Sequence, residues 1–276
     1  MKSKTRTVVA GGKSVEILEA GKGPPVLYLH GVYDVHSLQG EMFAFHEALA
    51  ESFTVIAPAH PGCGESTGIG EISNIEDLAF HYLDLLDALD IRSATIAGFC
   101  LGGWIATEMA VRNPERIGRM ALIAPAGLQE PGASVGDFFM YSQNRDGGIM
   151  RELRELLFAD ADGPIANGIV PDGRVSVSNE VRRYKSLTIT GRVGWEPPYL
   201  HDRKLRGRLR RITAPTMLVW GDTDRMIPIA NGRAYSENIP QASLRIVKGG
   251  GHSVQIEKPD EVLAHVVPFL KSGKDS

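Results

Sequence analysis

The chain of 276 residues has little cysteine, no long apolar run and no large excess of charge of either sign. Its only cysteines, Cys63 and Cys100, cannot form a disulfide framework and are expected to be free thiols in a reducing compartment. No stretch approaches the ~18 consecutive apolar residues of a membrane span, and the basic N-terminus MKSKTRTVVAGG lacks the apolar core of a signal peptide. We therefore expect a cytoplasmic protein that does not enter a membrane.

The charge balance argues against further classes of partner. The formal net charge is −3, whereas proteins that bind nucleic acids or membrane surfaces normally carry a basic excess. The basic run from Arg203 to Arg211 is interpreted as a solvated helix face, with a phosphate-binding patch as the less favoured interpretation. We expect a small-molecule substrate, no nucleic acid and no membrane as partners, and we leave a homodimer open.

Short apolar runs of strand length alternate with helix-compatible stretches along most of the chain. The predicted strands are 26–29, 54–57, 94–97, 120–124 and 216–220. The predicted helices are 75–89, 101–112, 229–238 and 261–270. This alternation predicts an α/β fold with a mostly parallel, doubly wound sheet, whose ligand groups lie at the carboxyl ends of the strands.

The alternation breaks down between residues 128 and 200. This part contains a short helix-like segment, RELRELLFAD, and the Gly- and Pro-rich segment GPIANGIVPDGR, but no strands for the sheet. Its aromatic and leucine side chains need burial, which argues against a long disordered excursion. We expect residues 128–200, here called the insertion, to form a helical cap on a core built from residues 1–127 and 201–276.

The segment GFCLGG, residues 98–103, carries the first candidate catalytic residue. Cys100 stands at a strand-to-helix junction with a glycine two positions before it and two positions after it. A sharp turn there strains the central residue, and glycine is needed where a β-carbon would meet the crossing chain. The start of the helix directs N–H groups and the positive end of the helix dipole toward the sulfur, which favours the thiolate. Cys100 is therefore the candidate nucleophile, and an inert buried cysteine is the competing interpretation.

Two later segments supply partners for a nucleophile. The loop WGDTDRMIP contains Asp222 and Asp224, and GGGHSVQIEKPDEV places His252 on a flexible loop ahead of the last helix. With GFCLGG, these motifs follow the order nucleophile, acid, histidine, and the chain resembles the α/β-hydrolase superfamily over nearly its whole length. The resemblance implies Cys100 as nucleophile, His252 as general base and Asp224 as the acid that orients it, with Asp222 as the rival acid.

The segment LHGV, residues 29–32, resembles the HG turn of the same superfamily. The resemblance implies an oxyanion hole formed by the backbone N–H groups of Val32 and Leu101, because amides are preorganised donors for a developing oxyanion. His30 is expected to brace this turn.

The stretch HGVYDVHS departs from the family pattern, since it lacks the second glycine often found downstream of the HG turn. Tyr33, Asp34 or His36 can therefore project into the pocket, although an exposed loop with a solvated Asp34 is the favoured interpretation. The candidate substrate-binding residues are His30, Tyr33 and Trp195.

These residues predict a reaction. A thiolate–imidazolium pair of Cys100 and His252 can attack a carbonyl carbon and form an acyl-thioester that water cleaves. The elbow GFCLGG resembles that of dienelactone hydrolases, which use a Cys-His-Asp set, and the capped layout is similar to esterases and carbon–carbon-bond hydrolases. We expect a hydrolase of small carboxylic esters, lactones or thioesters, with no metal ion. No cofactor is expected either, since the elbow glycines do not form the dinucleotide pattern GxGxxG.

Three competing functions remain open. The first is a carbon–carbon-bond hydrolase acting on a dienol or β-diketone, a substrate that can accept the electrons of the broken bond. The second is a serine hydrolase in which Cys100 replaces the nucleophilic serine. The third is a small-molecule sensor with a hydrolase fold.

Overall fold

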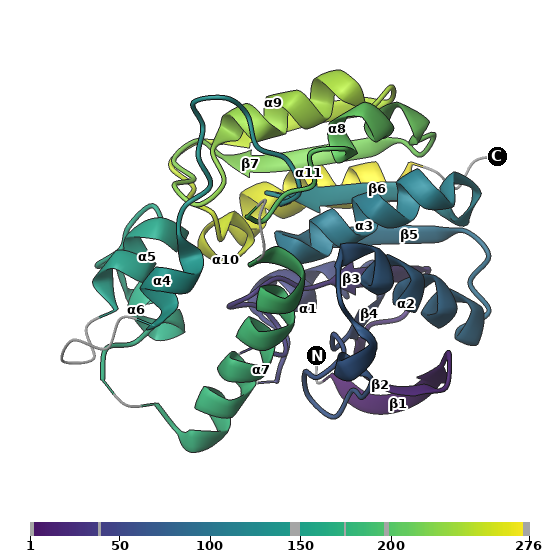
Figure 1. Cartoon of the computed structure of the whole chain (residues 1–276), viewed down its shortest axis with the longest axis horizontal. Helices are drawn as coiled ribbons and strands as arrows, with labels where there is room; N and C mark the ends of the chain where they lie inside the picture. Colours follow the sequence, from purple (N-terminus) through teal and green to yellow (C-terminus); the bar gives the residue numbers. More distant parts are fainter. Residues whose placement is uncertain (1–2, 38–39, 144–149, 174, 196–198, 273–276) are drawn as a thin grey trace.

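A computed structural model describes residues 3–37, 40–143, 150–173, 175–195 and 199–272, and its centre is one twisted sheet (Figure 1). The strands are β1 (Lys4–Ala10), β2 (Lys13–Ala20), β3 (Pro25–Leu29), β4 (Thr54–Pro58), β5 (Ala94–Phe99), β6 (Ile117–Ile123), β7 (Thr216–Gly221) and β8 (Ala242–Val247). Their order in the sheet is β1-β2-β4-β3-β5-β6-β7-β8. Strand β2 is antiparallel to β1 and β4, and all other neighbours are parallel.

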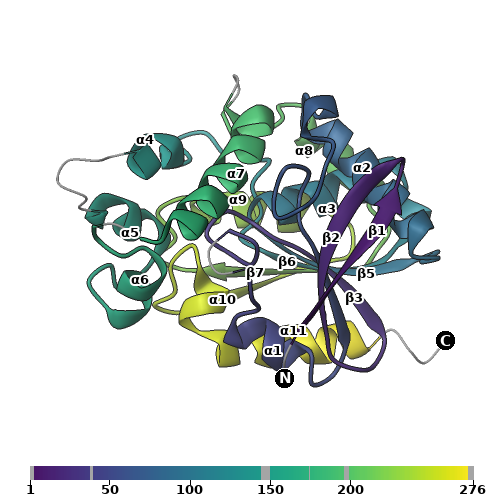
Figure 2. The ribbon, with the colours of Figure 1, turned by 90° about the horizontal axis from the view of Figure 1, so that it is seen from below.

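Helices cover both faces of this sheet (Figure 2). On one face lie α2 (Ile75–Ala88), α3 (Leu101–Arg112), α8 (Leu205–Arg208) and α9 (Ile229–Asn238). On the other lie α1 (Ala44–Leu49), α10 (Val254–Glu257) and α11 (Pro259–Lys271). The central strands are buried on both sides, which explains their continuous apolar runs. The predicted doubly wound α/β fold is confirmed, and among the described helices none is both long and apolar enough to cross a bilayer.

The insertion lies between β6 and β7. It contains α4 (Phe138–Gln143), α5 (Arg151–Leu157), α6 (Pro164–Ile169) and α7 (Val177–Gly194), and its described residues add no strand to the sheet. Its two ends meet: the N–H of Gly127 donates to the carbonyl of Leu200, and the N–H of Asp202 donates to the carbonyl of Gly127, both at 3.0 Å. The chain therefore leaves the sheet and returns to it at one place.

Helix α7 is fastened to the core by polar contacts. Lys185 donates to the carbonyl of Gly64 at 2.6 Å, and the hydroxyl of Ser37 donates to that of Ser186 at 3.0 Å. Both serines are buried, so this contact is shielded from water. These bonds hold the longest helix of the insertion against the loops that follow β3 and β4.

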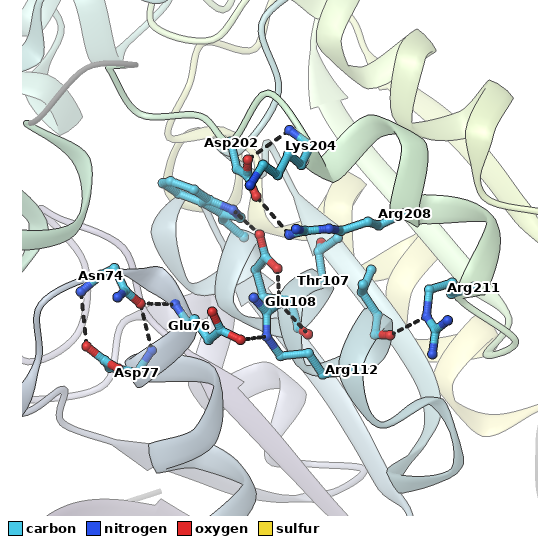
Figure 3. A network of polar contacts seen from close by, with 12 residues as sticks. Asn74, Glu76, Asp77, Thr107, Glu108, Arg112, Asp202, Lys204, Arg208 and Arg211 are labelled. Atoms are coloured by element: carbon cyan, nitrogen blue, oxygen red, sulfur yellow. Dashed lines mark hydrogen bonds and ion pairs between the residues drawn. The ribbon is translucent and has the colours of Figure 1, made fainter.

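A buried carboxylate supports α3 (Figure 3). Glu108 accepts a hydrogen bond from the indole Nε1 of Trp104 at 3.0 Å and pairs with the guanidinium of Arg112, which also reaches Glu76 of α2. Burial raises the pKa of Glu108. A β-carbon at Gly127 would lie 2.5 Å from the ring of Trp104, so the start of the insertion packs directly on this helix.

The basic run from 203 to 211 forms α8 and a short 3₁₀ turn. Most of its charged side chains are exposed, as expected for a solvated helix face. Two of them form ion pairs within the chain: Arg206 with Glu130 at 2.8 Å and Arg208 with Asp202 at 3.1 Å.

Candidate active site

Cys100 lies in a sharp turn between β5 and α3, with φ 49° and ψ −112°. A positive φ is strained for a residue other than glycine, and such strain gathers at functional sites. A β-carbon at Gly102 would lie 1.9 Å from the carbonyl oxygen of Leu29, and one at Gly98 would lie 2.8 Å from that of Gly102. Both glycines are therefore required by close backbone approach, which is the reason for the pattern seen in the sequence.

The acid and the histidine lie on the loops after β7 and β8. The Nδ1 atom of His252 is 2.9 Å from Oδ2 of Asp224, and both side chains are buried. The other oxygen of Asp224 accepts the N–H groups of Met226 at 2.9 Å and Ile227 at 2.8 Å, which fixes the carboxylate. The rival Asp222 is exposed and accepts the N–H of Gly249 at 2.6 Å. Asp224 is thus the carboxylate that contacts the imidazole.

The imidazole of His252 lies next to the turn that holds Cys100. Its ring centroid is 5.0 Å from that of Phe99, and its buried Nε2 has no hydrogen-bond partner among the described residues. Burial lowers the pKa of His252, but the charges of Asp224 and Cys100 outweigh this effect and raise the pKa to about 10. The imidazole thus contacts the carboxylate of Asp224, and its surroundings favour its protonated form.

His30 braces the loop that follows β3. Its Nδ1–H donates to the carbonyl of Gly31 at 2.9 Å, and its Nε2 accepts the N–H of His60 at 3.2 Å. The two imidazoles stack with centroids 3.7 Å apart. Burial, with the neighbouring histidines, holds the pKa of His30 well below its usual range. Both ring nitrogens are engaged with backbone, so the contacts support the bracing role and leave neither nitrogen to a substrate.

The two residues predicted to form the oxyanion hole, Val32 and Leu101, belong to the two segments that meet at Cys100. A β-carbon at Gly31 would be 3.0 Å from the β-carbon of Cys100, so the turn that contains Val32 packs against the nucleophile turn. Leu101 is the first residue of α3, where a backbone N–H has no carbonyl of a preceding turn to bond. The role of these two amides stays a prediction.

The expectation of an exposed loop with a solvated Asp34 is wrong. Asp34 is fully buried, and its carboxylate accepts hydrogen bonds from the hydroxyl of Tyr28 at 2.7 Å, the N–H of Val35 at 2.8 Å and the N–H of Gly31 at 3.4 Å. These donors replace water around the carboxylate. Burial nevertheless raises the pKa of Asp34 to about 6.

Tyr33 and Trp195 have different surroundings. Tyr33 is fully buried with φ 57°, its ring packs edge-on against Phe138 of α4, and its hydroxyl has no hydrogen-bond partner among the described residues. Trp195 is 52% exposed, packs on Phe139 and borders an open groove beside Arg192. Tyr33 thus joins the HG loop to the insertion, whereas Trp195 lies at the surface. Their substrate-binding roles stay predictions.

The second cysteine has the surroundings of an unreactive thiol. Cys63 is fully buried, and burial raises its pKa to about 12, which suppresses the thiolate. Within the described part of the chain, no group of three or more His, Cys, Asp or Glu side chains is arranged to hold a metal ion.

The comparison with known sequences identifies the family. Residues 24–259 match the family described as alpha/beta hydrolase fold. The chain therefore belongs to this family, and it is an enzyme of the hydrolase class.

Individual relatives differ in their activities. The chain is 30% identical over 271 residues to a dihydrolipoyllysine-residue acetyltransferase component of an acetoin cleaving system from Pseudomonas putida, covering 95% of this chain and 68% of that protein. It is 26% identical over 269 residues to a 2-hydroxymuconate semialdehyde hydrolase from Pseudomonas sp. strain CF600, covering 96% and 93%. The solved structure of a serine hydrolase from Cycloclasticus zankles is similar to this chain with a TM-score of 0.78 and 21% identity, and the match covers 99% of this chain and 100% of the hydrolase. At this identity the similarity is evidence for the fold only.

Proposed function

We propose that the chain hydrolyses small carboxylic esters, lactones or thioesters through an acyl-cysteine intermediate, without a cofactor. One observation carries the proposal: the imidazole of His252 is bonded to Asp224 at 2.9 Å, while its Nε2 is free of other hydrogen bonds among the described residues and Cys100 acts on its pKa. These observations support the proposed roles of Cys100 as nucleophile, His252 as base and Asp224 as orienting acid.

The proposed reaction has two stages. The Cys100 thiolate attacks the substrate carbonyl carbon, and the N–H groups of Val32 and Leu101 stabilise the oxyanion. Protonated His252 gives its proton to the leaving alkoxide or thiolate as that bond breaks, which leaves an acyl-thioester. His252 then takes a proton from water, whose oxygen attacks the thioester carbonyl, and the collapse releases the carboxylic acid and restores the thiolate.

A second candidate is carbon–carbon-bond hydrolysis. It is favoured by the similarity to a 2-hydroxymuconate semialdehyde hydrolase over 96% of this chain. Such a reaction requires a substrate that accepts the electrons of the broken bond, as a dienol or β-diketone does. Esters and lactones need no such electron acceptor, so turnover of one substrate class and not the other separates the two candidates.

Intact-protein mass spectrometry tests the proposal. The protein is mixed with a panel of activated esters, thioesters and lactones, and with dienol and β-diketone compounds. We expect a transient mass increase equal to the acyl group, present in the unmodified chain and in Cys63→Ala and absent from Cys100→Ala. Equal turnover by Cys100→Ala would remove Cys100 from the mechanism.

Two outcomes of the same panel distinguish a serine-type site and a sensor from the proposed cysteine hydrolase. A large gain in rate for Cys100→Ser would indicate a site shaped for serine, because sulfur is larger than oxygen and catalytic geometry is sensitive to small displacements. Tight binding of a panel compound with negligible turnover would favour a sensor.

A further inference from the structure

Glu257, the last residue of α10, joins the histidine loop to the insertion. Its Oε2 accepts the N–H of Gly251, the residue before His252, at 2.7 Å. Its Oε1 accepts the N–H of Ala159, just after α5, also at 2.7 Å. Figures 1 and 2 both place α5 beside α10. One half-buried carboxylate therefore accepts hydrogen bonds from both the histidine loop and the insertion.

The packing around this carboxylate is tight. A β-carbon at Gly251 would lie 2.6 Å from the backbone nitrogen of Ala159 and 2.7 Å from the carbonyl carbon of Phe158. On the other side of His252, the N–H of Ser253 donates to the carbonyl of Leu157 at 2.9 Å. Both chain neighbours of His252 are thus in contact with residues 157–159 of the insertion.

The acid loop rests on the same part of the insertion. Arg225, next to Asp224, donates to the carbonyl of Glu155 at 2.8 Å. A second hydrogen bond runs in the opposite direction: the N–H of Gly136 in the insertion donates to the carbonyl of Met226 in the acid loop at 2.7 Å. The loops that supply His252 and Asp224 are therefore both held by the insertion, and α5 with the residues after it supplies most of these contacts.

We propose that Glu257 is a positioning residue that couples the placement of the insertion to the orientation of the His252 imidazole. The inference rests on the proposed function, in which His252 is the general base. Gly249, Gly250 and Gly251 give the histidine loop little stiffness of its own, so its course depends on external bonds. A carboxylate that accepts two backbone N–H groups supplies strong, charge-assisted bonds of this kind.

The test compares Glu257→Gln with Glu261→Gln. The glutamine amide places an NH2 group against one of the two N–H donors, so one bond is lost at nearly constant size. Glu261 is an exposed residue of α11 paired with Lys258 at 3.0 Å, and it serves as the matched control. Steady-state kinetics use the best ester of the panel, and iodoacetamide alkylation of Cys100 is followed against pH by peptide mass spectrometry.

We expect Glu257→Gln to lower kcat about 10- to 100-fold with little change in KM, because catalytic geometry is sensitive to displacements of the order of 1 Å. The pH profile of Cys100 alkylation should differ from that of the unmodified chain, because a displaced imidazole changes the surroundings of the thiol, whereas Glu261→Gln should behave as the unmodified chain. Glu257→Asp keeps the charge but has a shorter side chain, so its kcat should lie between those of Glu257→Gln and Glu261→Gln.

Each outcome decides one point. A folded Glu257→Gln with unchanged kcat and an unchanged alkylation profile would overturn the proposal and leave Glu257 a structural role. If Glu257→Gln does not fold, an unchanged profile in Glu257→Asp would overturn it equally. If the unmodified chain hydrolyses nothing in the panel while Glu257→Gln shifts the alkylation profile, the hydrolase proposal fails and the coupling stands.

Discussion

Replacement of the buried acid, Asp224→Asn, tests the electrostatics of the site most directly. The pKa of His252 rises from 6.5 to about 10 although burial lowers it, because Asp224 and Cys100 outweigh that effect. This net rise, which remains after the opposing effect of burial, corresponds to about 5 kcal/mol in favour of the protonated ring. The N–H groups of Met226 and Ile227 hold the oxygen of the side chain at 224, so an asparagine would turn its NH2 group toward Nδ1.

That arrangement favours the imidazole tautomer with its proton on Nε2, which cannot accept a proton from the nucleophile or from water. We expect kcat/KM to fall roughly 10³- to 10⁴-fold, the size of effect known for a triad with the wrong tautomer. The assay is stopped-flow hydrolysis of an activated ester. The control is Asp222→Asn, whose side chain is exposed and bonds to Gly249. Unimpaired hydrolysis by Asp224→Asn, or an equal loss in Asp222→Asn, would refute the reasoning.

The same substitution has a pH signature in stability. Because the folded pKa of His252 is raised, its contribution to stability is complete below pH 6.5 and is lost as the pH rises toward about 10. Asp224→Asn should therefore lower the free energy of unfolding more at pH 6 than at pH 10.

Three further predictions concern packing, reactivity and pH. Gly102→Ala would place a β-carbon 1.9 Å from a backbone oxygen, so urea unfolding should show an unfolding free energy lower by about 3 kcal/mol or more. Gly168→Ala, whose β-carbon would have no atom within 4 Å, should raise the unfolding free energy by about 0.5–1 kcal/mol. Similar effects of the two substitutions would contradict the packing described. Cys63, whose pKa is raised to about 12, should resist alkylation by iodoacetamide in the folded protein while Cys100 reacts. Peptide mass spectrometry measures the labelling of each cysteine, and equal labelling of the two would contradict this prediction. The contribution of Asp34 to stability is complete below pH 3.8 and is lost as the pH rises through about 6. Denaturant titrations should therefore show that the difference in unfolding free energy between the unmodified chain and Asp34→Asn changes by about 3 kcal/mol across this range. A difference that stays constant with pH would contradict the raised pKa of Asp34.

Local sequence signals are sufficient for the core of the fold. The predicted helices 101–112 and 229–238 agree with α3 and α9 residue for residue, because their starts follow a sharp turn and a proline. The contact between His252 and Asp224 also agrees with the sequence motifs. These features depend on residues close together in the chain, or on a shared sheet edge that parallel strands impose.

Features that depend on distant contacts are not predictable in this way. Helix α7 has no clear sequence signal, because the side it turns to the core includes Ser186 and Thr190 and gives no apolar stripe. The burial of Asp34 depends on Tyr28 in β3, which no local pattern reveals. The hairpin of β1 and β2 is absent from the predicted strands, although Gly11-Gly12 between apolar stretches is a typical turn signal.

The paired hydrogen bonds of Gly127 with Leu200 and Asp202 have a consequence for how this protein can change over time. Because the insertion begins and ends at one place, a short linker in its stead would join Gly127 to residue 201 with little entropic cost and without disturbing strand pairing. Recombination there would exchange the whole insertion, while Cys100, Asp224 and His252, which follow strands β5, β7 and β8, stay in place.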